Sequence, residues 1–346
     1  MSRSRSAALF DRQAEACDSQ GSPFYADVLR RCAEDIDAGG PVADVLRGHE
    51  DDDADSALAL RLMGAVHRLV LRGQLPCLAV HYPSVGGDGD APAAWPVLRG
   101  VLTERAEEVR PLLDIAPQTN EVGRAAALLG GLLHVAAAFG LPVELHEIGC
   151  SAGLNLHADA FCYRDADGAH QWGPVDSPVV VGDAWRGTVP PVDAPLHVAR
   201  RLGSDVRPLD PASERDATTL LAYVWPDMTA RIDRLRAALA VAREHPSPVD
   251  RLDAVAAAER LRLVAGRAVV LWHSVMWQYI GADSQAAVTA RLEQLGAQAS
   301  ERAPLAHLSL EPVPGTPDFL VVLQTWPGSR RVLAAARPHG PPVEWR

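Results

Sequence analysis

The stretch VELHEIGCSAGLNLHADAF, residues 143–161, decides the fold of this chain. It opens with alternating, partly apolar residues that end at Ile148, which predicts a strand. Gly149-Cys150-Ser151-Ala152-Gly153 predicts a tight glycine turn, and residues 154–161 are expected to form a helix. A strand, a glycine turn and a helix make the first half of a βαβ unit, a common place for a nucleotide to bind an α/β sheet.

Two chemistries can use this glycine turn. One is a loop beneath an adenosyl cofactor, because glycine lets the backbone approach a ligand closely. The other is the nucleophile elbow of a serine hydrolase, because the turn also reads Gly-x-Ser-x-Gly with Ser151 at its centre. Glu311 and His339 follow in the order that a triad would need. However, the residues before 143 predict helices rather than the strands expected ahead of an elbow, and no HGGG-like oxyanion loop is evident.

Composition narrows the class of protein. The chain has 346 residues, of which 48% are apolar, so it can fold as one large domain or two modest ones. A net charge of −11 without a basic cluster argues against a nucleic-acid partner. The five cysteines form neither a CxxC pair nor a zinc-type spacing, so we expect reduced thiols, a cytoplasmic location and no metal site. The sequence shows no secretion signal and no uninterrupted apolar run near ~18 residues, so no membrane partner is expected.

The order of elements predicts a doubly wound α/β sheet. Residues 1–139 are expected to form a helical N-terminal region and residues 140–346 a Rossmann-like domain, with an irregular insertion at 162–195. The insertion is rich in Gly, Pro, Asp and Trp, with a possible short strand at 179–181. Helices alternate with predicted strands, and the last two strands form an antiparallel hairpin. The predicted strands after the turn cover residues 197–205, 249–253, 267–275, 305–313, 319–326 and 331–338.

Acidic and polar residues stand where an adenosyl cofactor needs them. Asp205 ends the second predicted strand and can hold ribose hydroxyls, and Asp253 ends the third and can meet the adenine amino group. His273 ends the fourth strand and can act as a general base. Each has a competing structural role: Asp205 as a turn cap, Asp253 as a helix N-cap and His273 as a hydrogen-bonded core residue.

The turn with its preceding acid, residues 147–153, resembles the first motif of class I S-adenosylmethionine-dependent methyltransferases, usually Glu-x-Gly-x-Gly-x-Gly. Ser151 replaces the middle glycine. The resemblance implies a seven-stranded, Rossmann-like sheet with a final antiparallel hairpin and S-adenosylmethionine as cofactor. Over most of its length the chain also resembles the bacterial family called domain of unknown function 2332, which supplies no established activity. The resembling segments are residues 117–124, 149–155, 201–210, 224–227 and 272–274.

We therefore expect a methyltransferase for an unknown small-molecule acceptor, in an unknown oligomeric state. A serine hydrolase using Ser151 and a degenerate methyltransferase fold acting as a binding or scaffold protein are the alternatives. The residues expected to bind the cofactor are Glu147, Gly149, Ser151, Gly153, Asn155, Asp205, Asp253 and His273. Those expected to act in catalysis are His273 and Tyr279. Those expected to bind the acceptor are Tyr25, Asn120, Glu121, Arg124 and Glu311, although Asn120 and Glu121 also suit the start of a helix at 123–139.

Overall fold

A computed structural model describes residues 3–52, 56–316 and 318–346. Contacts divide the chain into two compact units. Residues 1–119 with 214–233 form the helical unit, and residues 120–213 with 234–346 form the sheet unit. The sequence favours a different division, into a helical region at residues 1–139 and a Rossmann-like domain at 140–346. That functional division stays a prediction.

The helical unit buries the apolar faces of short amphipathic helices around one core. On α2 the residues Phe24, Val28, Leu29 and Cys32 are buried at the spacing of one helix face. Pro23 begins α2, a position that proline favours, and the Ser22 hydroxyl donates to Asp227 Oδ1 at 2.5 Å instead of capping the helix. The helices of this unit are α1 (Arg5–Ser19), α2 (Pro23–Asp37), α3 (Pro41–Val45), α4 (Leu58–Leu71), α5 (Pro76–Ala79), η2 (Pro83–Val85), α6 (Ala91–Glu104), α7 (Ala106–Val109), η3 (Arg110–Leu112) and α9 (Glu214–Ala222).

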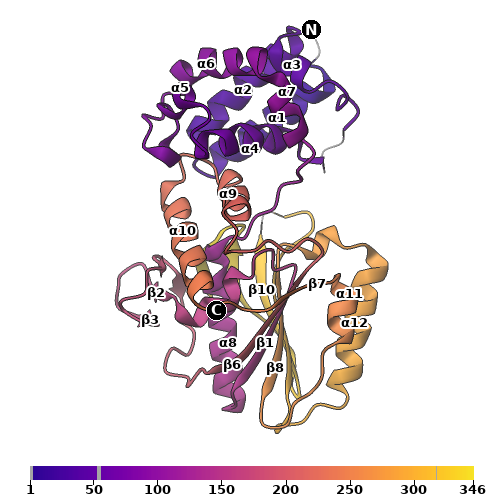
Figure 1. Cartoon of the computed structure of the whole chain (residues 1–346). Coiled ribbons are helices and arrows are strands. Elements are labelled where there is room, and N and C mark those ends of the chain that lie inside the picture. The colour runs from indigo at the N-terminus through magenta and orange to yellow at the C-terminus, as the bar shows by residue number, and fades with distance from the viewer. Residues whose placement is uncertain (1–2, 53–55, 317) are drawn as a thin grey trace. The chain divides into compact units, whose positions relative to one another are not determined.

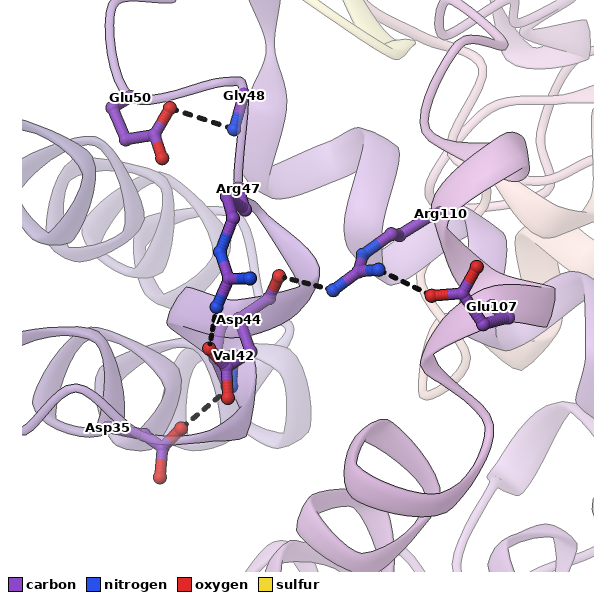
Figure 2. A network of polar contacts seen from close by, with 8 residues as sticks. All are labelled: Asp35, Val42, Asp44, Arg47, Gly48, Glu50, Glu107 and Arg110. Atoms are coloured by element: carbon purple, nitrogen blue, oxygen red, sulfur yellow. Dashed lines mark hydrogen bonds and ion pairs between the residues drawn. The ribbon is translucent and has the colours of Figure 1, made fainter.

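A polar network joins α2, α3 and α7 within this unit (Figure 2). The buried Asp35 carboxylate accepts from the Val42 amide at 2.8 Å, which satisfies an N–H in the first turn of α3. Arg110 donates to the Asp44 carbonyl at 3.0 Å and to Glu107 at 2.5 Å. The network therefore ties the short α3 to its neighbours.

The sheet unit has a mixed α/β fold with a large, mostly parallel central sheet, as predicted. The predicted number of seven strands is wrong, because in the described part of the chain the main sheet has nine, in the order β5-β12-β11-β10-β9-β8-β1-β6-β7. The two unexpected strands are β5, which comes from the insertion, and β12, which follows the predicted hairpin. The strands of this sheet are β1 (Val143–Ile148), β5 (Trp185–Gly187), β6 (Val198–Asp205), β7 (Val249–Arg251), β8 (Ala268–Ser274), β9 (Leu305–Pro312), β10 (Phe319–Trp326), β11 (Arg330–Arg337) and β12 (Gly340–Trp345).

The strand order reverses direction at β1. The chain moves from β1 to β6 and β7 on one side, then returns to β8 and β9 on the other, and these neighbours are all parallel. The order β7-β6-β1-β8-β9-β10 follows the Rossmann arrangement, although β10 is antiparallel to β9. Ligands of such sheets bind outside the carboxyl ends of the strands at the reversal. Here that place lies after β1 and β8, where the glycine turn begins.

Helices cover both faces of the sheet. Helix α8 (Ala125–Phe139) lies on one face, and α11 (Ala254–Glu259) and α12 (Ala282–Gly296) lie on the other (Figure 1). Ile148, Val269 and Leu271 are buried in the core beneath α11 and α12. β8 is buried along almost its whole length, as the continuous apolar run predicted for a central parallel strand.

Several local predictions need correction. The predicted helix after the glycine turn is a 3-10 helix, η5 (Leu154–Ala160), with a break at His157. The predicted helix at 123–139 begins with a 3-10 turn, η4 (Val122–Arg124), and Asn120 does not cap it. The insertion forms a separate small sheet, β3-β2-β4, from β2 (Cys162–Arg164), β3 (Gln171–Trp172) and β4 (Val180–Val181). Helix α9 ends before Trp225, and α10 (Thr229–Glu244) follows it.

One apolar segment reaches the length of a membrane span only if it is counted across a charged residue. Residues 122–139 form a helical segment long and apolar enough to cross a membrane, with a mean hydropathy of 1.6 despite Arg124. Within the protein 72% of this segment is buried, and α8 contacts β9 and β12. Core helices of globular proteins have the same composition, so the segment is weak evidence for a membrane span.

Candidate functional site

The glycine turn places three residues in the left-handed backbone region. Gly149, Ser151 and Gly153 have φ values of 66°, 56° and 69°. Glycine adopts this conformation freely, whereas a serine does so at a cost. A Cβ atom on Gly149 would also lie 3.0 Å from the Met276 side chain, so this glycine lets the turn approach the segment after β8.

Asp205 braces the turn from the end of β6. Its Oδ2 accepts from the Ser151 amide at 2.8 Å, and its Oδ1 accepts from the Arg207 amide at 2.8 Å. Asp205 thus lies at the end of β6, as predicted, and it also caps the turn that follows the strand. An ionised carboxylate has about four acceptor positions, so two amide donors leave both oxygens able to accept from ribose hydroxyls.

Asp253 lies beyond the end of β7, which finishes at Arg251 rather than at the predicted residue 253. Its carboxylate accepts from the Ala256 amide at 2.8 Å and is the N-cap of α11. The competing structural role is therefore present, and the exposed side chain keeps a second oxygen toward solvent.

Glu147 is a buried acid at the end of β1. Glu147 is only 3% exposed. In the strand register it lies between Trp272 of β8 and Gly203 of β6. Burial raises the pKa of Glu147 to about 8, although the Trp272 indole and the charge of Arg124 partly oppose the shift. The contact between Glu147 and the Trp272 indole falls short of normal hydrogen-bond geometry, so among the described residues neither Glu147 Oε2 nor Trp272 Nε1 has a well-formed hydrogen bond.

Two residues before α8 hold the beginning of η5. Asn120 Oδ1 accepts from the Leu154 amide at 2.9 Å, and Asn155 Nδ2 donates to the Glu121 carbonyl at 3.2 Å. Asn155 Oδ1 and Ser151 Oγ are buried without a partner in the described part of the chain. Four buried polar atoms without a well-formed hydrogen bond, on Glu147, Trp272, Ser151 and Asn155, therefore lie within and beside the glycine turn.

Glu121 and Arg124 connect this region to other parts of the sheet unit. Glu121 Oε1 accepts from the Gly123 amide at 3.0 Å, and its carboxylate forms longer ion pairs with Arg234 at 3.7 Å and His339 at 3.9 Å. Arg124 donates from Nε to the Pro338 carbonyl at 2.9 Å and from Nη1 to the Ser274 carbonyl at 3.4 Å. Arg124 therefore reaches the end of β8, at the reversal in strand order.

His273 is fully engaged by its neighbours. Its Nδ1 lies 2.7 Å from Glu311 Oε1, and its Nε2 lies 2.9 Å from His307 Nε2. Trp277 stacks on the ring at a centroid distance of 4.7 Å, and His273 is 2% exposed. Because both ring nitrogens are in hydrogen bonds, His273 could take a proton from an acceptor only by breaking one of them.

Sequence reasoning missed His307. Burial lowers its pKa to about 3, and the nearby His273 adds to the effect, so His307 is neutral at neutral pH. His307 and Glu311 lie four residues apart on β9, so both side chains are on the same face of the strand as Ser309. Ser309 is the register partner of His273 on β8, which places His273 on that face too. That spacing was available in the sequence, but the pairing of β8 with β9 in this register was not.

Glu311 links His273 to the segment after β8. Its Oε1 also accepts from the Met276 amide at 3.2 Å and the Trp277 amide at 3.4 Å. Since Met276 contacts the position of Gly149, the His273–Glu311 pair helps to fix the segment that lies against the glycine turn. The contacts of both residues thus bear on the position of this segment.

The two tyrosines have different surroundings. Tyr279 lies in η6 (Trp277–Tyr279) and is 76% exposed. Tyr25 belongs to the core of the helical unit, is 1% exposed and donates to the Met63 carbonyl at 3.4 Å. Tyr25 therefore has a structural role within its own unit.

The hydrolase triad is not assembled by the contacts observed. Glu311 hydrogen-bonds His273, whereas His339 pairs with Glu121. Ser151 does have the left-handed backbone of a nucleophile elbow, but its hydroxyl is buried.

The fold and the turn define an α/β protein with a Rossmann-type sheet and a glycine loop at its strand-order reversal. Residues 7–345 match the family described as "Uncharacterized protein conserved in bacteria (DUF2332)", and the chain belongs to this family. No curated protein and no solved structure matches the chain.

Proposed function

We propose that the sheet unit binds S-adenosylmethionine at the glycine turn and transfers its methyl group to a small-molecule acceptor. The observation that carries the proposal is the group of buried polar atoms on Glu147, Ser151, Asn155 and Trp272 that lack a well-formed hydrogen bond among the described residues. Each such atom costs about 1–3 kcal/mol, so a group of them beside one turn favours a polar ligand there.

The residues suit the two halves of such a cofactor. Asp205 retains acceptor capacity for ribose hydroxyls, and the glycines allow close backbone approach. Glu147, with a pKa near 8, carries a proton at neutral pH and can both donate and accept a hydrogen bond. Asn155 Oδ1 can accept from an ammonium group.

When bound, the sulfonium supplies an already activated methyl group, so the chain mainly has to align the acceptor with it. Arg124 and Glu121 offer charges of both signs near the end of β8 and are our candidates for acceptor selection. We assign His273 and Glu311 to positioning, through the segment at 275–277. A role for His273 or Tyr279 as the base stays a prediction.

Isothermal titration calorimetry with S-adenosylmethionine and S-adenosylhomocysteine tests the proposal. We expect binding by the wild type and about tenfold weaker binding by Asn155→Ala and Asp205→Asn, because each loses a hydrogen bond to the ligand. Asp283→Asn, at an exposed acid in the first turn of α12, is the matched control and should bind as the wild type does.

Other outcomes would overturn the proposal in distinguishable ways. Labelling of Ser151 by a fluorophosphonate, without binding of either adenosyl compound, would favour the hydrolase. Absence of adenosyl-ligand binding together with a stable protein partner would favour the scaffold.

We also propose a cytoplasmic location, since Cys17, Cys32, Cys77, Cys150 and Cys162 are all free thiols.

A further inference from the structure

A cavity lies in the sheet unit, on the face of the sheet that α11 covers rather than the face that α8 covers. Helix α11 has only six residues and leaves part of β1 and β6 uncovered. The resulting cavity has a volume of about 310 Å³, at the lower end for small-molecule sites. Its floor is apolar and includes Ile148, Leu202, Leu252 and Leu271.

Two arginines keep hydrogen-bond donors available at the edge of this cavity. Within the part of the chain that the structure describes, Arg200, whose side chain is 56% exposed, makes only a long ion pair with Glu144, at 3.6 Å. Among the described residues, Arg262 donates only through Nη1, to the carbonyls of Glu259 and Leu261 at 2.5 and 2.8 Å. These carbonyl contacts hold the Arg262 guanidinium in place while Nε and Nη2 stay available.

The charges around the cavity suit a ligand with one negative charge. Arg200, Arg260 and Arg262 are opposed by Asp250, which pairs with Arg260 at 2.9 Å, and by Glu144. Glu144 is also neutralised by Arg267, at 3.0 Å. Two further titratable residues are neutral at neutral pH, because burial lowers the pKa of His146 and raises that of Glu147 to about 8. Asp250 and Glu144 would repel each further negative charge on a ligand, so the balance of charges favours a monoanion held by the arginines.

We propose that this cavity is a binding site for a small carboxylic acid with a flat or short hydrocarbon body. The body would lie on the apolar floor, and the carboxylate would accept hydrogen bonds from Arg200 and Arg262. Arginine suits this role because its planar guanidinium matches a carboxylate. The cavity lies beside the glycine turn, because Glu147 and Ile148 line it and directly precede Gly149, but its two arginines belong to β6 and to the segment after α11.

Calorimetric titration of the full chain with 2-naphthoate tests the site, with the uncharged 2-naphthamide as the matched ligand. We expect the amide to bind about tenfold more weakly, since it lacks the charge-assisted hydrogen bonds. Arg200→Gln and Arg262→Gln should each weaken 2-naphthoate binding by about tenfold for the same reason. Arg337→Gln, on the distant strand β11, should leave binding unchanged.

A cavity-filling change provides an independent check. Ala257 of α11 lines the cavity, so Ala257→Phe should abolish 2-naphthoate binding while both arginines remain. Thermal unfolding of each variant shows whether the fold is intact. The proposal is overturned if 2-naphthoate does not bind, if acid and amide bind equally, or if folded variants bind as the wild type does.

Discussion

At the scale of single residues, the glycine turn combines a strained backbone with unsatisfied side chains. Ser151 holds a left-handed conformation that favours glycine, and its buried hydroxyl has no partner in the described ranges. Glu147 is buried at the end of the preceding strand. Such local costs persist where the surrounding structure enforces them, and they are concentrated at functional sites.

The backbone of Ser151 should limit the stability of the protein. We expect Ser151→Gly to raise the free energy of unfolding by up to about 1 kcal/mol. A left-handed serine costs roughly 1–2 kcal/mol, and the larger conformational entropy that glycine loses on folding offsets part of the gain. Ala152→Gly is the control, since Ala152 has no positive φ, and it should lower stability by about 0.5–1 kcal/mol. Urea denaturation measures both. An equal loss in the two variants would contradict the argument from strain.

Glu147 should make stability depend on pH. Its pKa rises from 4.5 to about 8 on folding, so between these values the folded protein holds a proton that the unfolded chain has released. Its contribution is therefore complete below the lower value and is lost as the pH rises toward the higher one. The slope approaches about 1.4 kcal/mol per pH unit.

Glu147→Gln is the matched variant because the amide does not titrate. The difference in the free energy of unfolding, wild type minus variant, should fall steadily from about pH 5 to about pH 8 in urea denaturation. A difference that stays constant over this range would show that Glu147 is not shifted in the folded protein.

At the scale of elements, packing rather than propensity determines where helices can approach the sheet. Gly130 and Gly131 lie in the middle of α8, where glycine is unfavourable by itself. A Cβ atom on Gly130 would lie 2.0 Å from the Trp345 ring, and one on Gly131 would lie 2.3 Å from Leu308. The two glycines therefore allow close contact of α8 with β12 and β9.

The same substitution in two helices should have opposite effects. Gly130→Ala should lower the free energy of unfolding by about 1–3 kcal/mol, because the added methyl group collides with Trp345. Gly100→Ala in α6 should raise it by about 0.5–1 kcal/mol, because a Cβ atom there meets no described atom within 4 Å. Thermal and urea unfolding measure both variants. A stabilising Gly130→Ala would show that the packing against Trp345 is loose.

At the scale of the whole molecule, the insertion and the end of the chain complete the central sheet together. β5 joins the sheet only through β12, in a parallel pair from Val343 to Trp345. Trp185 of β5 also donates from Nε1 to the Ala126 carbonyl of α8 at 3.1 Å. These contacts attach the irregular segment at 162–195 to the main fold.

Ending the chain after His339 should therefore destabilise the sheet unit strongly. The shortened chain loses β12 and the buried Trp345 and leaves β5 without its sheet partner, so we expect a loss of more than about 4 kcal/mol. Arg346→Ala, at the exposed last residue, should change stability by less than about 0.5 kcal/mol. Urea denaturation compares the two, and a shortened chain as stable as the wild type would contradict the role of β12.

Some features of this protein follow from short stretches of sequence alone. Alternation predicted β1 and the hairpin of β10 and β11, the apolar run predicted β8, and the spacing of glycines located the turn. These features depend on residues close together in the chain, where the repeat of 2 or 3.6 residues and the freedom of glycine act directly.

Other features were decided only by the tertiary structure. Four such features join segments that are distant in the chain. They are the hydrogen bond between His273 and His307, the support of η5 by Asn120, the pairing of β5 with β12, and the cavity edged by Arg200 and Arg262. Periodicity states which face of an element is apolar, but not which strand lies beside it or in which register. The ligand-binding potential of this chain is therefore set by strand order and register, which determine which polar groups meet and which are left without partners.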